Sequence, residues 1–209
     1  MTLSLNEVEV LTKKAARGAG YPWGLAEEAG KATRWLHQFG LDGCAALAGL
    51  LGDVDGSDLM DWAPVTGAHW SAGGGTLCPI ATGAALSDRA GDLAGSDLQF
   101  GPTAHPLLLA PFAAWSAKAA DHTVSLKWQD CTVVTDGEAV SISGTPNAAR
   151  GEVTVATGAP LGTLLARSSR AAPTPEAVAK LTEIAGRTYA PATEESRMRG
   201  AGSGLSDND

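Results

Sequence analysis

Cysteine is scarce in this chain. Its three residues, Cys44, Cys78 and Cys131, lie far apart, and no CxxC pair occurs. A sparse, odd number of cysteines is typical of reduced thiols in a cytosolic protein, so we expect a cytoplasmic location. A disulfide-stapled scaffold is not required either, because a chain of 209 residues can bury a full hydrophobic core.

Positive charge is also in short supply. The chain has 15 lysine and arginine residues against 23 aspartate and glutamate residues, which gives a net charge of −8. The densest basic group is Arg197 and Arg199, with Arg187 upstream. Nucleic-acid binding needs clustered cations that displace counterions, so we expect neither nucleic acid nor an anionic membrane surface as a partner.

Long hydrophobic runs are absent. The longest apolar stretch, Pro106 to Trp115, is far shorter than the roughly 20 residues that a membrane-spanning helix needs. Glu7 and Glu9 lie near the N-terminus with no basic residue before the apolar positions, so this segment does not predict a signal peptide.

Three helices are predicted in the first fifty residues. Ser4 and Glu7 have the spacing of a capping box, in which the serine hydroxyl and the glutamate satisfy free amides of the first turn. A second helix is indicated by apolar residues at three- and four-residue intervals over residues 25–39. Asp42 is expected to cap a third, shorter helix.

Strand patterns follow after a loop-rich, acidic stretch at residues 52–75. Apolar and polar residues alternate over residues 124–128, 140–142 and 153–155, as they do in half-buried strands. The dipeptide Asp136-Gly137 predicts a two-residue type I′ hairpin turn.

Two helices are expected in the later part of the chain. Residues 111–120 predict a helix that begins at a proline. Thr174-Pro175-Glu176 predicts the start of a C-terminal helix, and Thr193 is expected to cap a further turn. We therefore predict an α+β fold with an N-terminal three-helix segment, a mostly antiparallel sheet and C-terminal helices. Residues 1–52 form the helical segment and residues 53–209 the α+β portion, as one compact unit.

Cofactor and metal motifs are incomplete. The acidic residues 53–58 lack the glycine and glutamate positions of an EF-hand loop. The glycines of residues 71–76 lack the lysine of a P-loop, and those of residues 200–204 do not follow a strand. The four histidines show no metal-ligand spacing. The sequence thus identifies no cofactor and predicts no metal site.

One group of polar residues joins the two ends of the chain. Arg17, Tyr21 and Trp23 surround a rigid Tyr-Pro-Trp-Gly turn, and Arg197, Arg199 and Asp207 lie near the C-terminus. Arginine binds carboxylate or phosphate in a bidentate manner, an aromatic wall excludes water, and a glycine-rich tail is suited to a lid. We predict that these residues enclose a ligand pocket. The alternative is that the tail charges are simply solvated.

Candidate catalytic residues are fewer. Glu27 and Glu28 follow the aromatic turn, where either could act as a general base. The alternative is that they stabilise the first turn of their helix through its dipole. His69 precedes Cys78 in the glycine-rich loop region and is a third candidate.

Two stretches carry a resemblance to a known family. The N-terminal LSLNEVEVLTKKAARGAGYPWGLAEEAGKATRWL and the C-terminal TYAPATEESRMRGAGSGLSDND together resemble an uncharacterised alphaproteobacterial, roseobacter-type family known as a domain of unknown function. The resemblance implies a bacterial cytoplasmic protein of small-molecule metabolism.

The first fifty residues are also similar to the helical N-terminus of the malate/lactate dehydrogenase family that lacks a Rossmann fold. Leu41-Asp42-Gly43-Cys44 stands where that family has Asp-Ser-His. Because the histidine is missing, this similarity does not assign a nicotinamide cofactor.

Two functional hypotheses follow. The first is an enzyme, or the subunit of one, that acts on a small anionic metabolite. The second is a non-catalytic metabolite-binding or assembly subunit, for which a homo-oligomer is a natural form. The sequence contains no complete catalytic motif and leaves both open.

Overall fold

The computed structural model describes residues 2–93 and 97–189. Its first three helices are those that the sequence predicts: α1 (Leu5–Gly18), α2 (Trp23–Gln38) and α3 (Gly43–Asp53). The capping box of α1 is present. Ser4 Oγ accepts a hydrogen bond from the Glu7 amide at 3.1 Å, and the Glu7 carboxylate accepts one from the Ser4 amide at 2.6 Å. Asp42 caps α3 by accepting the Ala45 amide at 2.9 Å.

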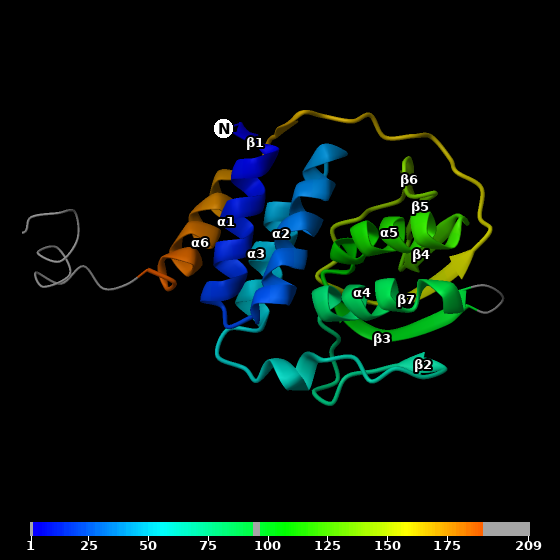
Figure 1. Ribbon diagram of the computed structural model, residues 1–209, viewed down its shortest axis with the longest axis horizontal. Coiled ribbons are helices and arrows are strands. Elements are labelled where there is room, and N and C mark those ends of the chain that lie inside the picture. The colour runs from blue at the N-terminus through cyan, green and yellow to red at the C-terminus, as the bar shows by residue number, and fades with distance from the viewer. Residues whose placement is uncertain (1, 94–96, 190–209) are drawn as a thin grey trace, which may run out of the picture.

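A fourth helix, α6 (Pro175–Gly186), joins these three and packs against α1 and α3 (Figure 1). The contact between α1 and α6 is very close. A Cβ atom at Gly18 would lie 2.0 Å from the Ile184 carbonyl oxygen, so only glycine allows the two backbones to approach in this way. The further C-terminal turn predicted after Thr193 lies outside the described residues.

Six strands form the main sheet, in the order β2-β3-β7-β4-β5-β6. Only β2 and β3 are parallel, and the other neighbours are antiparallel, as predicted. A short antiparallel pair, β1 (Leu3–Ser4) with β8 (Arg170–Ala171), lies apart from it. The strands of the main sheet are β2 (His69–Trp70), β3 (Leu98–Ala104), β4 (Val124–Trp128), β5 (Cys131–Thr135), β6 (Val140–Ser143) and β7 (Arg150–Thr157).

The turn between β5 and β6 differs from the prediction. Four residues, 136–139, connect the strands rather than two. Gly137 has a positive φ of 94°, but Asp136 does not, so the turn is not type I′. Asp136 instead accepts the amides of Glu138 and Ala139 at 2.9 and 2.7 Å. The aspartate side chain therefore organises the longer loop.

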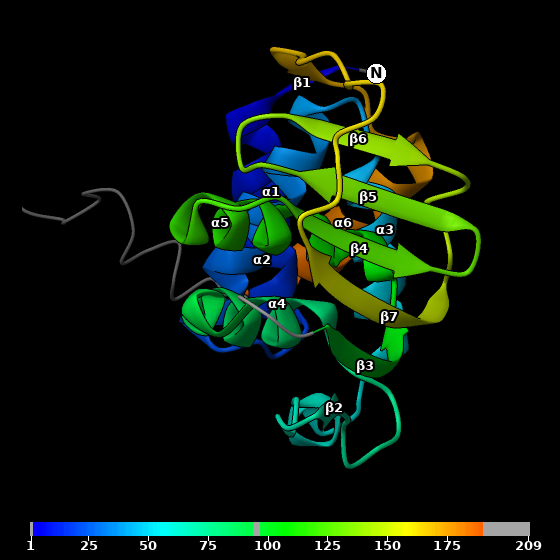
Figure 2. The same cartoon turned by 90° about the vertical axis from the view of Figure 1, so that its right-hand side faces the viewer.

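Helices cover one face of the sheet. The helix predicted at residues 111–120 is α5 (Ala110–Ala120), which contacts β4 and β5 on one side and α2 on the other. The opposite face of the sheet is turned away from the helices (Figure 2). The remaining helical elements are α4 (Pro79–Asp88), η1 (Leu59–Trp62), η2 (Ala90–Leu93) and η3 (Pro106–Leu109).

The core joins both parts of the chain. Trp128 of β4, Phe100 of β3 and Phe112 of α5 are fully buried together with leucines of α2 and α3. This arrangement confirms the predicted α+β class. Among the described residues, none of the helices combines the length and apolar character that crossing a bilayer demands.

Candidate functional site

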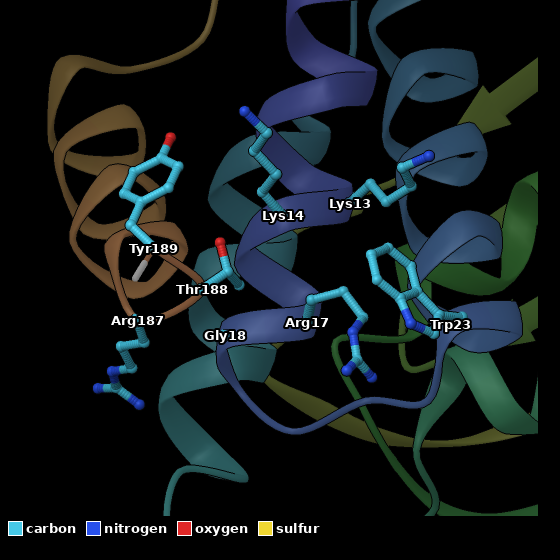
Figure 3. Close-up of a pocket in the computed structure, with 8 residues that line it drawn as sticks. All are labelled: Lys13, Lys14, Arg17, Gly18, Trp23, Arg187, Thr188 and Tyr189. Atoms are coloured by element: carbon cyan, nitrogen blue, oxygen red, sulfur yellow. The ribbon is translucent and has the colours of Figure 1, made fainter. Parts of the chain in front are cut away.

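A cleft of about 480 Å³ lies where α1, α2 and the end of α6 meet (Figure 3). We call it the cationic cleft, because four of its eight lining residues are basic. The lining residues are Lys13, Lys14, Arg17, Gly18, Trp23, Arg187, Thr188 and Tyr189. The first four belong to adjacent turns of α1, so helical spacing alone brings them to one surface. The cleft thus combines an N-terminal helix with the last described residues of the chain.

The aromatic turn before α2 forms one side of the cleft. Trp23 is 63% exposed, whereas Tyr21 is buried and does not line the cleft. The Tyr21 hydroxyl lies 3.3 Å from Cys78 Sγ, and burial raises the pKa of Tyr21. Tyr21 therefore anchors the turn, while Trp23 presents its ring to the solvent.

Arg17 connects α1 to this turn. Its guanidinium lies 4.6 Å from the centre of the Trp23 ring and donates a hydrogen bond to the Tyr21 carbonyl oxygen. An arginine over an indole ring is held by a cation–π attraction. Since only one guanidinium nitrogen is used in that hydrogen bond, the others remain able to bind an anion.

The opposite side of the cleft comes from the residues after α6. Arg187 forms a bidentate ion pair with Asp55, with distances of 2.6 and 3.0 Å. The hydrogen bonds from Arg187 lower the pKa of Asp55, and those to Asp55 raise the pKa of Arg187. Tyr189 is 62% exposed, and Lys14 Nζ lies 5.5 Å from the centre of its ring.

The cleft carries an excess of positive charge. Lys13 is 3.6 Å from a Glu27 carboxylate oxygen, and Arg187 is paired with Asp55. Lys14 and Arg17 have no carboxylate partner among the described residues. Two unpaired cations beside two exposed rings favour a ligand that is negatively charged.

The structure brings together only part of the predicted site. Arg17 and Trp23 line the cationic cleft, and Glu27 reaches it through Lys13. Glu28 is paired with Lys31 at 2.8 Å and does not line the cleft. His69 lies exposed on β2, where it is paired in register with Gln99. Arg197, Arg199 and Asp207, and with them the proposed lid, lie outside the described residues.

Six lining residues were not foreseen as site residues: Lys13, Lys14, Gly18, Arg187, Thr188 and Tyr189. Lys13 and Lys14 precede Arg17 by one helical turn, so the spacing along α1 could have identified them. Arg187 and Tyr189 gave no comparable signal, because they reach the cleft only through the packing of α6 on α1.

One side-chain cluster has the composition of a metal site. His37, Asp42 and Cys44 place one ligand atom each within 4.8 Å of one another. Two of these ligand groups already have structural partners: His37 Nε2 accepts a hydrogen bond from the Cys44 amide at 3.3 Å, and the Asp42 carboxylate accepts hydrogen bonds from the amides of Ala45 and Thr174 at 2.9 Å. Burial also raises the pKa of the Cys44 thiol to about 12. The cluster is therefore assigned to helix capping.

Comparisons with known proteins give a limited answer. A search of curated proteins finds no match. A solved structure, malate dehydrogenase from Entamoeba histolytica, is similar with 9% sequence identity and a TM-score of 0.42. The similarity covers 75% of this chain and 49% of the malate dehydrogenase chain, so this chain spans about half the length of that enzyme. At this level it supports no functional argument.

A family model does match the N-terminal part. It is described as "Protein of unknown function (DUF3726)" and covers residues 3–78. The match contains the three N-terminal helices and five of the residues that line the cationic cleft. The resemblance to a domain-of-unknown-function family is thereby supported over residues 3–78.

Proposed function

We propose that the cationic cleft binds a small anionic metabolite that carries a carboxylate or phosphate group. The observation that supports this most directly is the gathering of Lys13, Lys14, Arg17 and Arg187 around one cleft in a chain whose net charge is −8. The volume of about 480 Å³ is in the range of small-molecule sites.

The lining favours binding over catalysis in this cleft. None of the eight described residues that line it is an aspartate, glutamate, histidine or cysteine, which are the usual general acids, bases and nucleophiles. Glu27 is the nearest predicted base, and its carboxylate faces Lys13. A metabolite-binding protein of the cytoplasm is therefore our first proposal, and an enzyme that uses Glu27 on a bound anion is the second.

Isothermal titration with inorganic phosphate and with malonate tests the proposal. Arg17→Gln is expected to weaken binding roughly tenfold, because a hydrogen bond to a charged group contributes about 1.5 kcal/mol. Lys14→Ala removes the second unpaired cation. Lys127→Ala is the matched control, since Lys127 is exposed on β4 and distant in sequence from the cleft.

Salt dependence provides a second measurement. Raising sodium chloride from about 0.05 M to about 0.3 M shortens the Debye length and is expected to weaken binding. Affinities that are equal in the wild type, Arg17→Gln and Lys14→Ala would contradict the proposal, as would the absence of heat with both anions. Turnover of a bound anion that is lost in Glu27→Gln would favour the enzyme over the binding protein.

A further inference from the structure

A second cleft, of about 350 Å³, lies along α3. We call it the histidine cleft. Ala45 and Ala46 of α3 line it, together with Asp42, the residue that caps this helix. His105, Leu107, Thr174 and the loop of residues 146–149 complete the wall. None of these residues takes part in the cationic cleft.

The face of α3 is shaped to hold the His105 imidazole. Asp42, Ala46, Gly49 and Asp53 follow one another at three- and four-residue intervals, so they lie along one side of the helix. A Cβ atom at Gly49 would lie 2.3 Å from His105 Cε1. The imidazole therefore occupies the space that a side chain at position 49 would otherwise fill.

The backbone fixes where the imidazole begins. His105 directly follows β3 and has φ 41° and ψ 60°, a left-handed conformation that is uncommon for a residue with a side chain. Its amide donates to the Ala149 carbonyl oxygen at 2.8 Å, which ties it to the loop on the other side of the cleft. Pro106 follows and begins η3. The position of His105 is thus set from both sides.

Asp53 orients the ring. His105 Nε2 lies 3.3 Å from Asp53 Oδ2, and the His105 side chain is 17% exposed. A carboxylate at this distance favours the tautomer with hydrogen on Nε2, which leaves the lone pair of Nδ1 free. No other hydrogen bond to this imidazole occurs within the described part of the chain. Burial lowers the pKa of His105, so the ring is neutral near pH 7 and can accept a proton.

The charge of the histidine cleft selects against anions. Its lining residues within the described part of the chain include Asp42 but no lysine or arginine, and most of the others are apolar. A negatively charged ligand would be repelled by Asp42 and would find no cation there. A neutral molecule with an apolar body fits this lining best, and the Asn147 carboxamide offers it a polar contact.

We propose that the histidine cleft hydrolyses small neutral esters, with His105 as general base and Asp53 as the residue that positions it. Nδ1 of His105 takes a proton from a water molecule while the water oxygen forms a bond to the acyl carbon. The bond from that carbon to the alcohol oxygen then breaks. The imidazolium returns its proton to the departing oxygen, and a carboxylic acid and an alcohol result.

This site is separate from the cationic cleft. Thr174, which lines the histidine cleft, directly precedes α6, whereas Tyr189 lies beyond its end. The 12 residues of α6 span about 18 Å at 1.5 Å per residue. The proposal therefore stands or fails independently of anion binding.

Hydrolysis of p-nitrophenyl acetate by the full chain is the test. We expect His105→Gln to lower kcat/KM by roughly a hundredfold, in the range found for general bases. His122→Gln is the matched control, since His122 is exposed in the loop before β4. The anionic p-nitrophenyl phosphate is expected to remain unhydrolysed.

The role of Asp53 has its own measurement. Asp53→Asn is expected to lower kcat and to shift the pH–rate profile while KM stays unchanged, and Asp53→Glu to restore part of the rate. A structural role alone would not produce this pattern.

Should His105→Gln fail to fold, Ala45→Trp serves instead, because Ala45 is exposed at the cleft. A bulky side chain there is expected to block hydrolysis. Equal rates in the wild type, His105→Gln and Ala45→Trp, or a wild-type rate no higher than the uncatalysed one, would overturn the proposal.

Discussion

The two clefts differ in charge, although residues 53–55 contribute an aspartate next to each of them. Asp55 pairs with Arg187 of the cationic cleft, and Asp53, two residues earlier, pairs with His105 of the histidine cleft. Among the residues that the structure describes, four cations line the first cleft and none lines the second. The difference indicates two ligand classes, an anion at one end of α6 and a neutral molecule at the other.

The two aspartate pairs also differ in their surroundings. The side chains of Arg187 and Asp55 are 40% and 41% exposed, so water and salt screen their attraction. The His105 side chain is 17% exposed and is packed against α3. An exposed ion pair contributes little to stability, whereas a more buried pair also fixes the orientation of its side chains. We therefore expect changes at the histidine cleft to affect both folding and chemistry.

The largest expected effect is that of Gly18→Ala. The added Cβ would lie 2.0 Å from the Ile184 carbonyl oxygen. Because this oxygen belongs to the backbone of α6, the clash is relieved only if α6 moves away from α1. We expect the free energy of unfolding to fall by about 3 kcal/mol, and phosphate binding to be lost. Urea denaturation measures the first and titration the second.

Gly24→Ala is the control for this change. A Cβ atom at Gly24 meets no atom within 4 Å, and alanine is the better residue in a helix by about 1 kcal/mol. The variant should be as stable as the wild type or more so. Equal destabilisation by the two substitutions would show that the α1–α6 contact is not the cause.

Gly49→Ala comes next. Its Cβ would displace the His105 ring, but a side chain can move where a backbone cannot, so we expect a loss of about 1 kcal/mol. The chemical shift of the His105 Cε1 proton should change, and phosphate binding should not. Gly52→Ala, with no atom within 4 Å, is the control. A changed chemical shift of this proton in both variants would contradict the contact between Gly49 and the His105 ring.

The two aspartate pairs should lose their contributions to stability at different pH values. Burial lowers the pKa values of His37 and His105 in the folded state, so unfolding takes up protons below the ordinary histidine pKa of about 6.5. Their stabilising contribution is complete above that pH and is lost as the pH falls. The contribution of Asp55, whose pKa is lowered, is lost only when the pH falls below the ordinary aspartate range.

Urea denaturation at a series of pH values measures this separation. We expect the free energy of unfolding to fall between about pH 7 and pH 5. The fall should be smaller in His105→Gln and unchanged in Asp55→Asn. An identical pH dependence in all three proteins would show that His105 is not buried in its neutral form.

The smallest effect is expected for Asp55→Asn. The pair is exposed, so stability should hardly change. Without the carboxylate, Arg187 adds its full charge to the cationic cleft, and phosphate should bind roughly threefold more tightly. Titration of both proteins measures this. Weaker binding would mean that Asp55 holds Arg187 in the geometry that an anion needs.

Local signals explain why α1, α2, α3, α5 and α6 were predictable, whereas α4 was not predicted. The capping box at Ser4 and Glu7 and the cap at Asp42 are interactions between residues three positions apart, and their spacing is visible in the sequence. The β5–β6 turn shows the limit of such signals. Asp136-Gly137 suits a two-residue turn, but the aspartate side chain binds amides further along and stabilises a longer one.

The candidate sites were predictable only in part. Arg17 and Trp23 were identified from the turn that they flank, and both line the cationic cleft. Tyr21 carries the same aromatic signal, yet its hydroxyl is buried against Cys78, more than fifty residues away in sequence. Exposure and burial of neighbouring aromatics depend on such distant contacts, which no local pattern encodes.

By itself, the sequence determined the helix caps, the apolar stripes and the strand alternation, because these depend on residues close together in the chain. It also determined the acidic balance of charge, which depends on composition alone. Only the tertiary structure decided which charges meet. Arg187 reaches α1 because Gly18 lets α6 approach, and His105 reaches Asp53 because Gly49 leaves room for its ring. Both contacts join segments more than fifty residues apart, so packing rather than local preference sets them.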